Sequence, residues 1–281
     1  MTNFFQRTLL FVIGLPILLF IIIFFDRFSH LGWSLVVVVT SALGTVEALS
    51  LFVPGHKRWE LVLLTFFGAL IPAAAVLDYL YEPQVQLMLL AFILAAFVIL
   101  FLRLFIWSGE ELSCFTGRTA ALLTALLYPA LFMAFLVRFA EFSEPLPVVL
   151  LFLVLNFGND TCAYLAGRFF GDRSWHIFSV SPKKTVVGYI GGFTGAVLLG
   201  SLFALLRPDI FSVPWHFRIL FFLTVAVIAD VGDLVESALK RGAEKKDSGK
   251  VIPGRGGMLD SIDSLLFSAP FFYYIGLIIF T

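Results

Sequence analysis

One stretch of the chain, residues 231–263, collects acidic and basic side chains at close spacing within an otherwise apolar sequence. Asp233, Glu236, Ser237 and Lys240 are related by spacings of three and four, so a helix would place them on one face. Carboxylates are hard oxygen ligands, and Mg²⁺ is usually bound by one or two of them together with substrate phosphates. This stripe therefore predicts a metal site beside a phosphate-bearing substrate.

A further pair of carboxylates, Asp260 and Asp263, follows a glycine-rich segment. In that segment Gly256 and Gly257 would let backbone N–H groups approach an anion closely. Carboxylates, basic side chains and a glycine-rich turn together favour phosphoryl or nucleotidyl transfer. The alternative is a solvated loop whose basic residues only fix the membrane topology. That alternative leaves the acidic residues at the membrane boundary unexplained.

A second group of polar residues precedes this stretch. Asn159 and Asp160 end an apolar run, and Lys183 and Lys184 follow the Ser-Pro pair at 181–182. We expect this pair to form the cap and first turn of a helix, so both lysines would lie at a helix N-terminus, where the dipole favours phosphate. The alternative is a basic anchor that only holds this end of the helix in the cytoplasm.

The composition places all of these residues in a membrane protein. The 281 residues are 60% hydrophobic and 14% charged, with a mean hydropathy of +1.00. These values lie outside the range of soluble globular domains. The 19 Lys and Arg residues balance the 19 Asp and Glu residues, so no excess positive charge would attract nucleic acid. We therefore expect an all-α, polytopic membrane protein without a nucleic-acid partner.

Apolar stretches of about 20 residues cross the hydrocarbon core as helices. The sequence contains nine such stretches, near residues 8–25, 31–53, 59–80, 84–107, 118–140, 146–166, 185–206, 216–239 and 262–280. No linker or internal repeat interrupts them, so we predict a single membrane-embedded domain over 1–281. Within it, 1–145 would supply lipid-facing or dimer-forming helices, and 146–281 would supply the catalytic helices and loops.

Basic residues at the ends of these stretches indicate the orientation, because the side rich in Lys and Arg stays in the cytoplasm. Most of them, Lys57, Lys184 and Lys245 included, fall on one side. We predict a cytoplasmic N-terminus, an external C-terminus and a location in the inner, cytoplasmic membrane of the cell. The two most polar loops, 167–184 and 240–261, would then share the cytoplasmic face and could build one site together.

Glu47 is an acidic residue within the second predicted span. An ionised side chain at such depth costs several kcal/mol unless it is paired, bound to metal or facing a watery cavity. The sequence shows no partner near Glu47, and we interpret it as a structural hydrogen-bonding residue.

Several segments of the second half resemble the signature of phosphatidate cytidylyltransferases, the CDP-diacylglycerol synthases. They are residues 237–241 (SALKR), 246–248 (KDS) and 253–263 (PGRGGMLDSID). Residues 159–171 and 181–192 are similar to that family's other motifs. The resemblance covers spans six to nine. It implies that the chain condenses CTP with phosphatidic acid to form CDP-diacylglycerol and pyrophosphate.

The resemblance also suggests roles for individual residues. Metal ligands would be Asp233, Asp260 and Asp263, with Asp160 and Glu236 as additional ligands. Catalytic side chains would be the same three aspartates with Lys240 and Arg241. Substrates would be bound by Asn159, Lys183, Lys184, Ser237, Asp247, Arg255, Gly256 and Gly257. The family further implies Mg²⁺, a second cation such as K⁺, contact with membrane lipids and a homodimer.

The chain departs from the family's pattern at three positions. The family usually has His where this chain has Arg255, Arg where it has Ser261, and Glu where it has Val187. The acidic residues are retained, while two positions near the phosphates differ. One hypothesis is that Arg255 supplies the positive charge that is missing at Ser261. The alternative is a paralogue with weakened or altered activity.

Two other functions fit part of the pattern. A CTP-dependent polyprenol or phytol kinase would transfer the γ-phosphate to a lipid alcohol and release CDP. A secondary transporter would also use carboxylates within the membrane. Transporters often carry paired repeats with broken helices at the midplane, whereas the charges here gather near one end of the chain and on one face.

Overall fold

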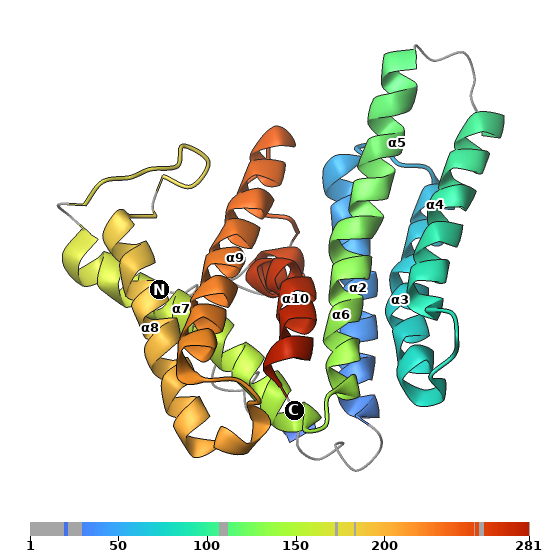
Figure 1. Ribbon diagram of the computed structural model, residues 1–281. Coiled ribbons are helices and arrows are strands. Elements are labelled where there is room, and N and C mark those ends of the chain that lie inside the picture. The colour runs from blue at the N-terminus through green and yellow to red at the C-terminus, as the bar shows by residue number, and fades with distance from the viewer. Residues whose placement is uncertain are drawn as a thin grey trace. The chain divides into compact units, whose positions relative to one another are not determined.

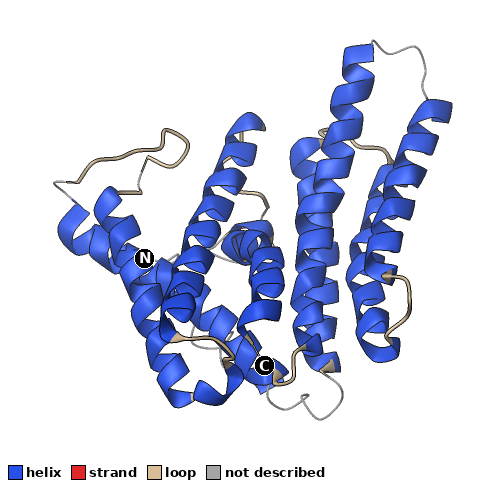
Figure 2. Cartoon of the chain, viewed as in Figure 1, coloured by secondary structure: helices blue, strands red, loops and turns tan. Residues whose placement is uncertain are grey.

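The computed structural model describes residues 20–21, 30–106, 112–171, 174–182, 184–249, 251–252 and 256–280. In this part of the chain the regular structure is helical, apart from two isolated β-bridges (Figure 2). The prediction of an all-α protein is confirmed.

Among the described residues, seven helices are long and apolar enough to cross a membrane. They are Leu31–Phe52, Arg58–Tyr81, Leu87–Phe105, Cys114–Glu141, Pro145–Phe170, Val186–Leu206 and Leu259–Ile279. Of the nine predicted stretches, 8–25 lies almost entirely outside the described residues. The stretch predicted at 216–239 forms a helix, Trp215–Gly242, but its charged residues make it more polar than the other seven.

The chain forms two compact units, Met1–Arg138 with Gly242–Ile262, and Phe139–Arg241 with Asp263–Thr281. The first unit joins the N-terminal helices to the glycine-rich segment, and the second contains the helices that carry Asp160 and Asp233. The last long helix contributes its first turn to the first unit and the rest to the second.

The first unit is built from long apolar helices (Figure 1). These are α2 (Leu31–Phe52), α3 (Arg58–Tyr81), α4 (Leu87–Ile106), α5 (Leu112–Leu126) and α6 (Phe132–Arg138). A π-helical turn, Leu127–Leu131, joins α5 to α6 and contains Pro129. Proline has no backbone N–H to donate to the preceding turn, which explains the widened geometry at this point.

Buried polar groups fix the packing of α2 in this unit. Ser41 Oγ donates to the carbonyl of Gly68 on α3 at 2.6 Å, and Trp33 Nε1 donates to the carbonyl of Leu136 on α6 at 2.7 Å. A Cβ atom on Gly68 would come within 2.6 Å of Thr45 Oγ1, so the two helices meet at backbone distance. These contacts hold α2 rigidly against its neighbours.

The second unit contains α7 (Pro145–Phe170), α8 (Val186–Leu206), most of α9 (Trp215–Gly242) and most of α10 (Leu259–Ile279). Its apolar core is a cluster of aromatic rings. The ring centroids of Phe139, Phe152 and Phe272 lie 5.0 to 5.1 Å apart, and Phe221 packs on Phe272 at 5.1 Å. Tilted and edge-on aromatic contacts of this kind stabilise a core beyond the area they bury. They join α7, α9 and α10.

Small residues bring α8 against α7, because Gly191 and Gly195, four residues apart, let the two helices approach closely. A Cβ atom on Gly191 would lie 2.2 Å from Ala166 Cβ, and one on Gly195 would lie 2.4 Å from Cys162 Cβ. No side chain larger than hydrogen fits at these positions without moving a helix. The close approach fixes the register in which α7 and the start of α8 present polar residues.

Candidate functional site

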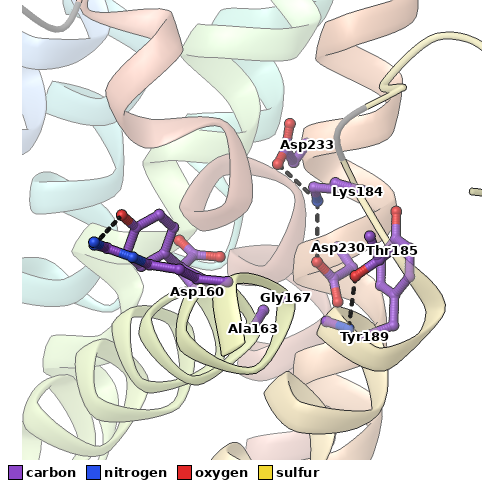
Figure 3. A pocket seen from close by; sticks show the side chains of 11 residues that line it. Asp160, Ala163, Gly167, Lys184, Thr185, Tyr189, Asp230 and Asp233 are labelled. Atoms are coloured by element: carbon purple, nitrogen blue, oxygen red, sulfur yellow. Dashed lines mark hydrogen bonds and ion pairs between the residues drawn. The ribbon is translucent and has the colours of Figure 1, made fainter. Parts of the chain in front are cut away.

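A pocket of about 480 Å³ opens in the second unit (Figure 3). Residues of α7, the end of the loop before α8, α8 and α9 line it. Its polar members are Asp160, Tyr164, Arg168, Lys184, Thr185, Tyr189, Asp230 and Asp233, with Ala163, Gly167 and Gly188 between them. Both predicted constellations, the one near 160 and the one near 233, therefore contribute side chains to one cavity.

Lys184 is the central charge of this pocket. Its Nζ lies 2.7 Å from Asp233 Oδ2 and 3.1 Å from Asp230 Oδ1, and 5.3 Å from the ring centroid of Tyr189 (Figure 3). Burial opposes the charged form, but the carboxylates of Asp233 and Asp230 hold the pKa of this ammonium well above its ordinary value. Lys184 is therefore a permanent cation beside two carboxylates.

The start of α8 places Lys184. Thr185 is the N-cap residue, and its Oγ1 accepts a hydrogen bond from the Gly188 backbone N–H at 3.1 Å. The prediction that the Ser-Pro pair at 181–182 begins this helix was wrong, because Thr185 can satisfy a first-turn N–H and the helix begins at Val186. Lys184 still lies at the helix N-terminus, immediately before the cap.

A group of carboxylates lies in the same unit. Asp263 lies within electrostatic reach of Asp233, Glu236 and Asp160. Glu236 is buried, and its Oε2 lies 2.7 Å from Lys240 Nζ one turn along α9. The predicted stripe on α9 is therefore formed, with Ser237 Oγ also 3.4 Å from Asp233 Oδ1.

This group fits a divalent cation in the chemistry of its donors, because its members are carboxylates that repel one another. Within the described residues, no three His, Cys, Asp or Glu side chains are arranged to hold a metal ion by themselves. Mg²⁺ is commonly held in proteins by one or two carboxylates, while substrate phosphates and water complete its shell.

The first unit contains the glycine-rich segment 247–258, here called the signature loop, and Asp260. Asp260 Oδ2 accepts hydrogen bonds from the backbone N–H groups of Ser248 and Gly257, each at 2.8 Å, and from Ser248 Oγ at 3.0 Å. One carboxylate oxygen thus ties the two ends of the loop together. Asp260 organises the loop through this oxygen, in addition to its predicted role as a metal ligand.

Gly256 turns the signature loop back on itself. Its φ of +109° is a conformation that side chains rarely adopt, and it exchanges backbone hydrogen bonds with Ile252 at 2.8 and 3.1 Å. A Cβ atom there would also lie 2.6 Å from Asp260 Oδ2. Position 256 therefore requires glycine, because the turn is sharp and packs directly against the Asp260 carboxylate.

The other predicted site residues are placed as follows. Asn159 is buried on α7 against Asp230, Arg241 is exposed in the last turn of α9, and Asp247 is exposed at the start of the signature loop. Lys183 and Arg255 lie outside the described residues.

Several polar residues of these sites were absent from the predicted set, among them Asp230, Thr185 and Ser248. Asp230 is a carboxylate within an apolar stretch, and its spacing of three from Asp233 could have identified it. Thr185 directly follows the paired lysines as an evident capping residue. Ser248 lies in the quoted KDS segment, but the sequence does not indicate which side chains it contacts.

The second unit thus brings Lys184, which lies in one of the motifs, next to the carboxylates of Asp230 and Asp233. A sequence profile of the Cytidylyltransferase family matches residues 5–279, nearly the whole chain. The chain belongs to this family. Membership applies to the N-terminal helices as well, because the match extends well beyond the motifs in the second half.

Individual cytidylyltransferases are similar over shorter segments. A phosphatidate cytidylyltransferase of Bacillus subtilis is 42% identical over 123 residues, which are 43% of this chain and 44% of that protein. The enzyme of the same name from Thermotoga maritima is 41% identical over 160 residues, 56% and 58% of the two chains. The one from Synechocystis is 38% identical over 139 residues, 47% and 45%. The matched segments span about half the length of these relatives.

Proposed function

We propose that this cytidylyltransferase condenses CTP with phosphatidic acid to give CDP-diacylglycerol and pyrophosphate. The observation that carries the proposal is the pocket in which Lys184, a residue of one of the family's motifs, meets Asp230 and Asp233. The names of the relatives add support, since several are phosphatidate cytidylyltransferases.

The reaction needs alignment and charge neutralisation more than a general base. A phosphomonoester has a second pKa of about 6, so the phosphate of phosphatidic acid is largely dianionic at neutral pH. One of its oxygens forms a bond to the α-phosphorus of CTP, and the bond from that phosphorus to the bridging oxygen breaks. The electron pair leaves with pyrophosphate. Lys184 is a permanent cation placed to bind a phosphate in this exchange.

Mg²⁺ would neutralise phosphate charge in this site when bound. We assign Asp233 and Asp263 as its principal ligands, with Asp160 and Glu236 as additional ligands, and Asp260 stays a predicted metal ligand. A second cation such as K⁺ remains part of the proposal. Lys240 and Arg241 would hold the departing pyrophosphate, and Asn159, Ser237, Asp247, Gly256 and Gly257 would contact the substrates, together with Lys183 and Arg255.

The proposed location in the membrane follows from the chemistry of the two substrates. Phosphatidic acid and its product keep their acyl chains in the bilayer, which suits an integral membrane protein. CTP would enter from the cytoplasm, so we propose the inner membrane as the location, with the site on its cytoplasmic face. We further propose a homodimer.

The test is an assay of purified protein with Mg²⁺, phosphatidate and CTP labelled at the α-phosphate. We expect label in the lipid extract, release of pyrophosphate and loss of both after chelation of Mg²⁺. Label remaining in the aqueous phase, with an Asp260→Asn variant behaving like the wild type, would overturn the proposal.

The same assay separates the alternatives. A lipid-alcohol kinase would release labelled CDP and transfer label only from γ-labelled CTP to an added polyprenol. A transporter would consume no CTP with either lipid. The distribution of α-label and γ-label therefore assigns the class of reaction in one experiment.

A further inference from the structure

Glu47 is a buried acid of α2 that the proposed reaction does not use. Its side chain is 6% exposed and lies in the helix Leu31–Phe52, which is apolar enough to span a membrane. The expected structural hydrogen bonds are present, but both partners lie more than 200 residues away, at the two ends of the signature loop. Glu47 Oε2 accepts from Ser248 Oγ at 3.1 Å and from the Leu259 backbone N–H at 3.0 Å.

The Ser248 hydroxyl connects Glu47 to Asp260. Ser248 Oγ lies 3.1 Å from Glu47 Oε2 and 3.0 Å from Asp260 Oδ2, so its single proton is shared between two carboxylates. The same oxygen lies 3.3 Å from the backbone N–H of Asp260, for which it is an acceptor. Glu47 therefore acts on the orientation of Asp260 through one intervening hydroxyl and through the first residue of α10.

The backbone of the signature loop also packs closely against the Glu47 carboxylate. A Cβ atom on Gly249 would lie 2.5 Å from Glu47 Oε1, and one on Gly257 would lie 2.4 Å from Glu47 Oε2. Backbone from both ends of the loop thus encloses the carboxylate. Hydrogen bonds to an ionised acceptor are stronger than neutral ones, and their strength rises where water is excluded.

The helix that carries Glu47 is itself firmly held by its contacts with α3 and α6. A helix held in this way, with a buried acceptor, is a fixed reference point for the described ends of the signature loop. We propose that Glu47 is a positioning residue, which holds the signature loop and thereby orients Asp260, a predicted metal ligand of the cytidylyltransferase reaction. The proposal rests on the proposed function, and concerns a residue outside all of the recognised motifs.

Substitutions that remove the acceptor test this role. Glu47→Leu keeps the size of the side chain and abolishes both hydrogen bonds, whereas Glu47→Gln keeps one oxygen in place of Oε2. We expect Glu47→Leu to lower kcat/KM for CTP by about tenfold or more and Glu47→Gln to remain within about threefold of the wild type, because one neutral acceptor still serves both donors.

Hydrogen exchange provides a readout that does not depend on activity. In Glu47→Leu we expect faster exchange in peptides covering 247–259, with protection of α2 and α3 unchanged. Ser41→Ala is the matched control. It removes a buried hydrogen bond from the same helix, to the carbonyl of Gly68, without touching the loop. It should leave the exchange of the loop and kcat/KM for CTP as in the wild type.

Ser248→Ala removes the hydrogen bond to Glu47 from the side of the loop. If Glu47 acts through Ser248, the double variant with Glu47→Leu should be less impaired than the product of the two single effects predicts. Unchanged exchange of 247–259 in Glu47→Leu would overturn the proposal, as would faster exchange spread equally through α2 and α3. A wild-type protein without cytidylyltransferase activity would refute the proposed function instead, and the exchange measurements would still decide whether Glu47 orders the loop.

Discussion

Lys184 shows how much of this site depends on one charge. Two carboxylates, Asp230 and Asp233, contact its ammonium in a pocket that is only partly open to water. These partners raise the pKa of Lys184 above the ordinary lysine value of about 10.4, so Lys184 is charged at every pH below that value. The stabilisation from the ion pairs is lost only when the pH rises through the raised pKa. Phosphate binding at Lys184 should therefore not weaken between about pH 7 and about pH 9.

Replacing Lys184 should separate its contribution to phosphate binding from its contribution to stability. We expect Lys184→Met to lower kcat/KM for CTP at least tenfold, about 1.4 kcal/mol, and to lower the thermal midpoint because two carboxylates lose their counter-ion. A Lys184→Met/Asp230→Asn double variant should recover stability without recovering activity. If it recovers both, Lys184 only balances charge and does not bind phosphate.

Arg255 carries the main difference between this chain and the family's signature. We expect Arg255→Ala to reduce turnover about tenfold or more, as the loss of one charge-assisted phosphate contact would. Adding Ser261→Arg to that variant should restore part of the activity. Steady-state rates with saturating CTP measure both effects. Near-normal turnover in Arg255→Ala would show that this arginine does not replace the missing charge at Ser261.

At the scale of elements, the contact between α7 and α8 positions the pocket. Gly191 has no room for a side chain, because a Cβ atom would lie 2.2 Å from Ala166 Cβ. We expect Gly191→Val to force the helices apart and to lower the free energy of unfolding by about 1 to 3 kcal/mol. The residues of α7 and α8 that line the pocket would move with the helices. Thermal unfolding in detergent should show a lowered midpoint together with weaker CTP binding.

Gly117 on α5 supplies the control for this substitution. A Cβ atom there would meet nothing within 4 Å, so Gly117→Ala should be neutral or slightly stabilising. A Gly191→Val variant that is as stable as Gly117→Ala would contradict the close packing of α7 and α8.

At the scale of the whole molecule, the distribution of basic residues predicts a single orientation in the membrane. Lys245 lies in the segment after α9, and Asp209 lies between α8 and α9 in a short helical turn, Pro208–Ile210. With Cys114 and Cys162 replaced by serine, a cysteine introduced at 209 should react with a membrane-impermeant maleimide in intact spheroplasts. A cysteine at 245 should react only after lysis. The reverse pattern would invert the topology and move the proposed site to the outside.

The sequence by itself determined the helical, membrane-spanning class and the family. Both follow from signals that are local along the chain. Runs of apolar residues of about 20 positions predict spans regardless of how the helices pack, and the spacing of Asp233, Glu236 and Lys240 places them on one helix face before any contact is known.

Only the tertiary structure decided which distant residues meet. Lys184 pairs with Asp230 and Asp233 across 46 and 49 positions of sequence, and Glu47 meets Ser248 across 201. Such pairs depend on how helices pack against one another, and nothing in the local spacing encodes that packing. The sequence also left the boundary of α8 open, because Thr185 and Ser181 are both plausible caps, and the hydrogen bond from the Gly188 N–H to Thr185 selects the first. Local periodicity therefore determines the elements, whereas packing determines which of their side chains form a site.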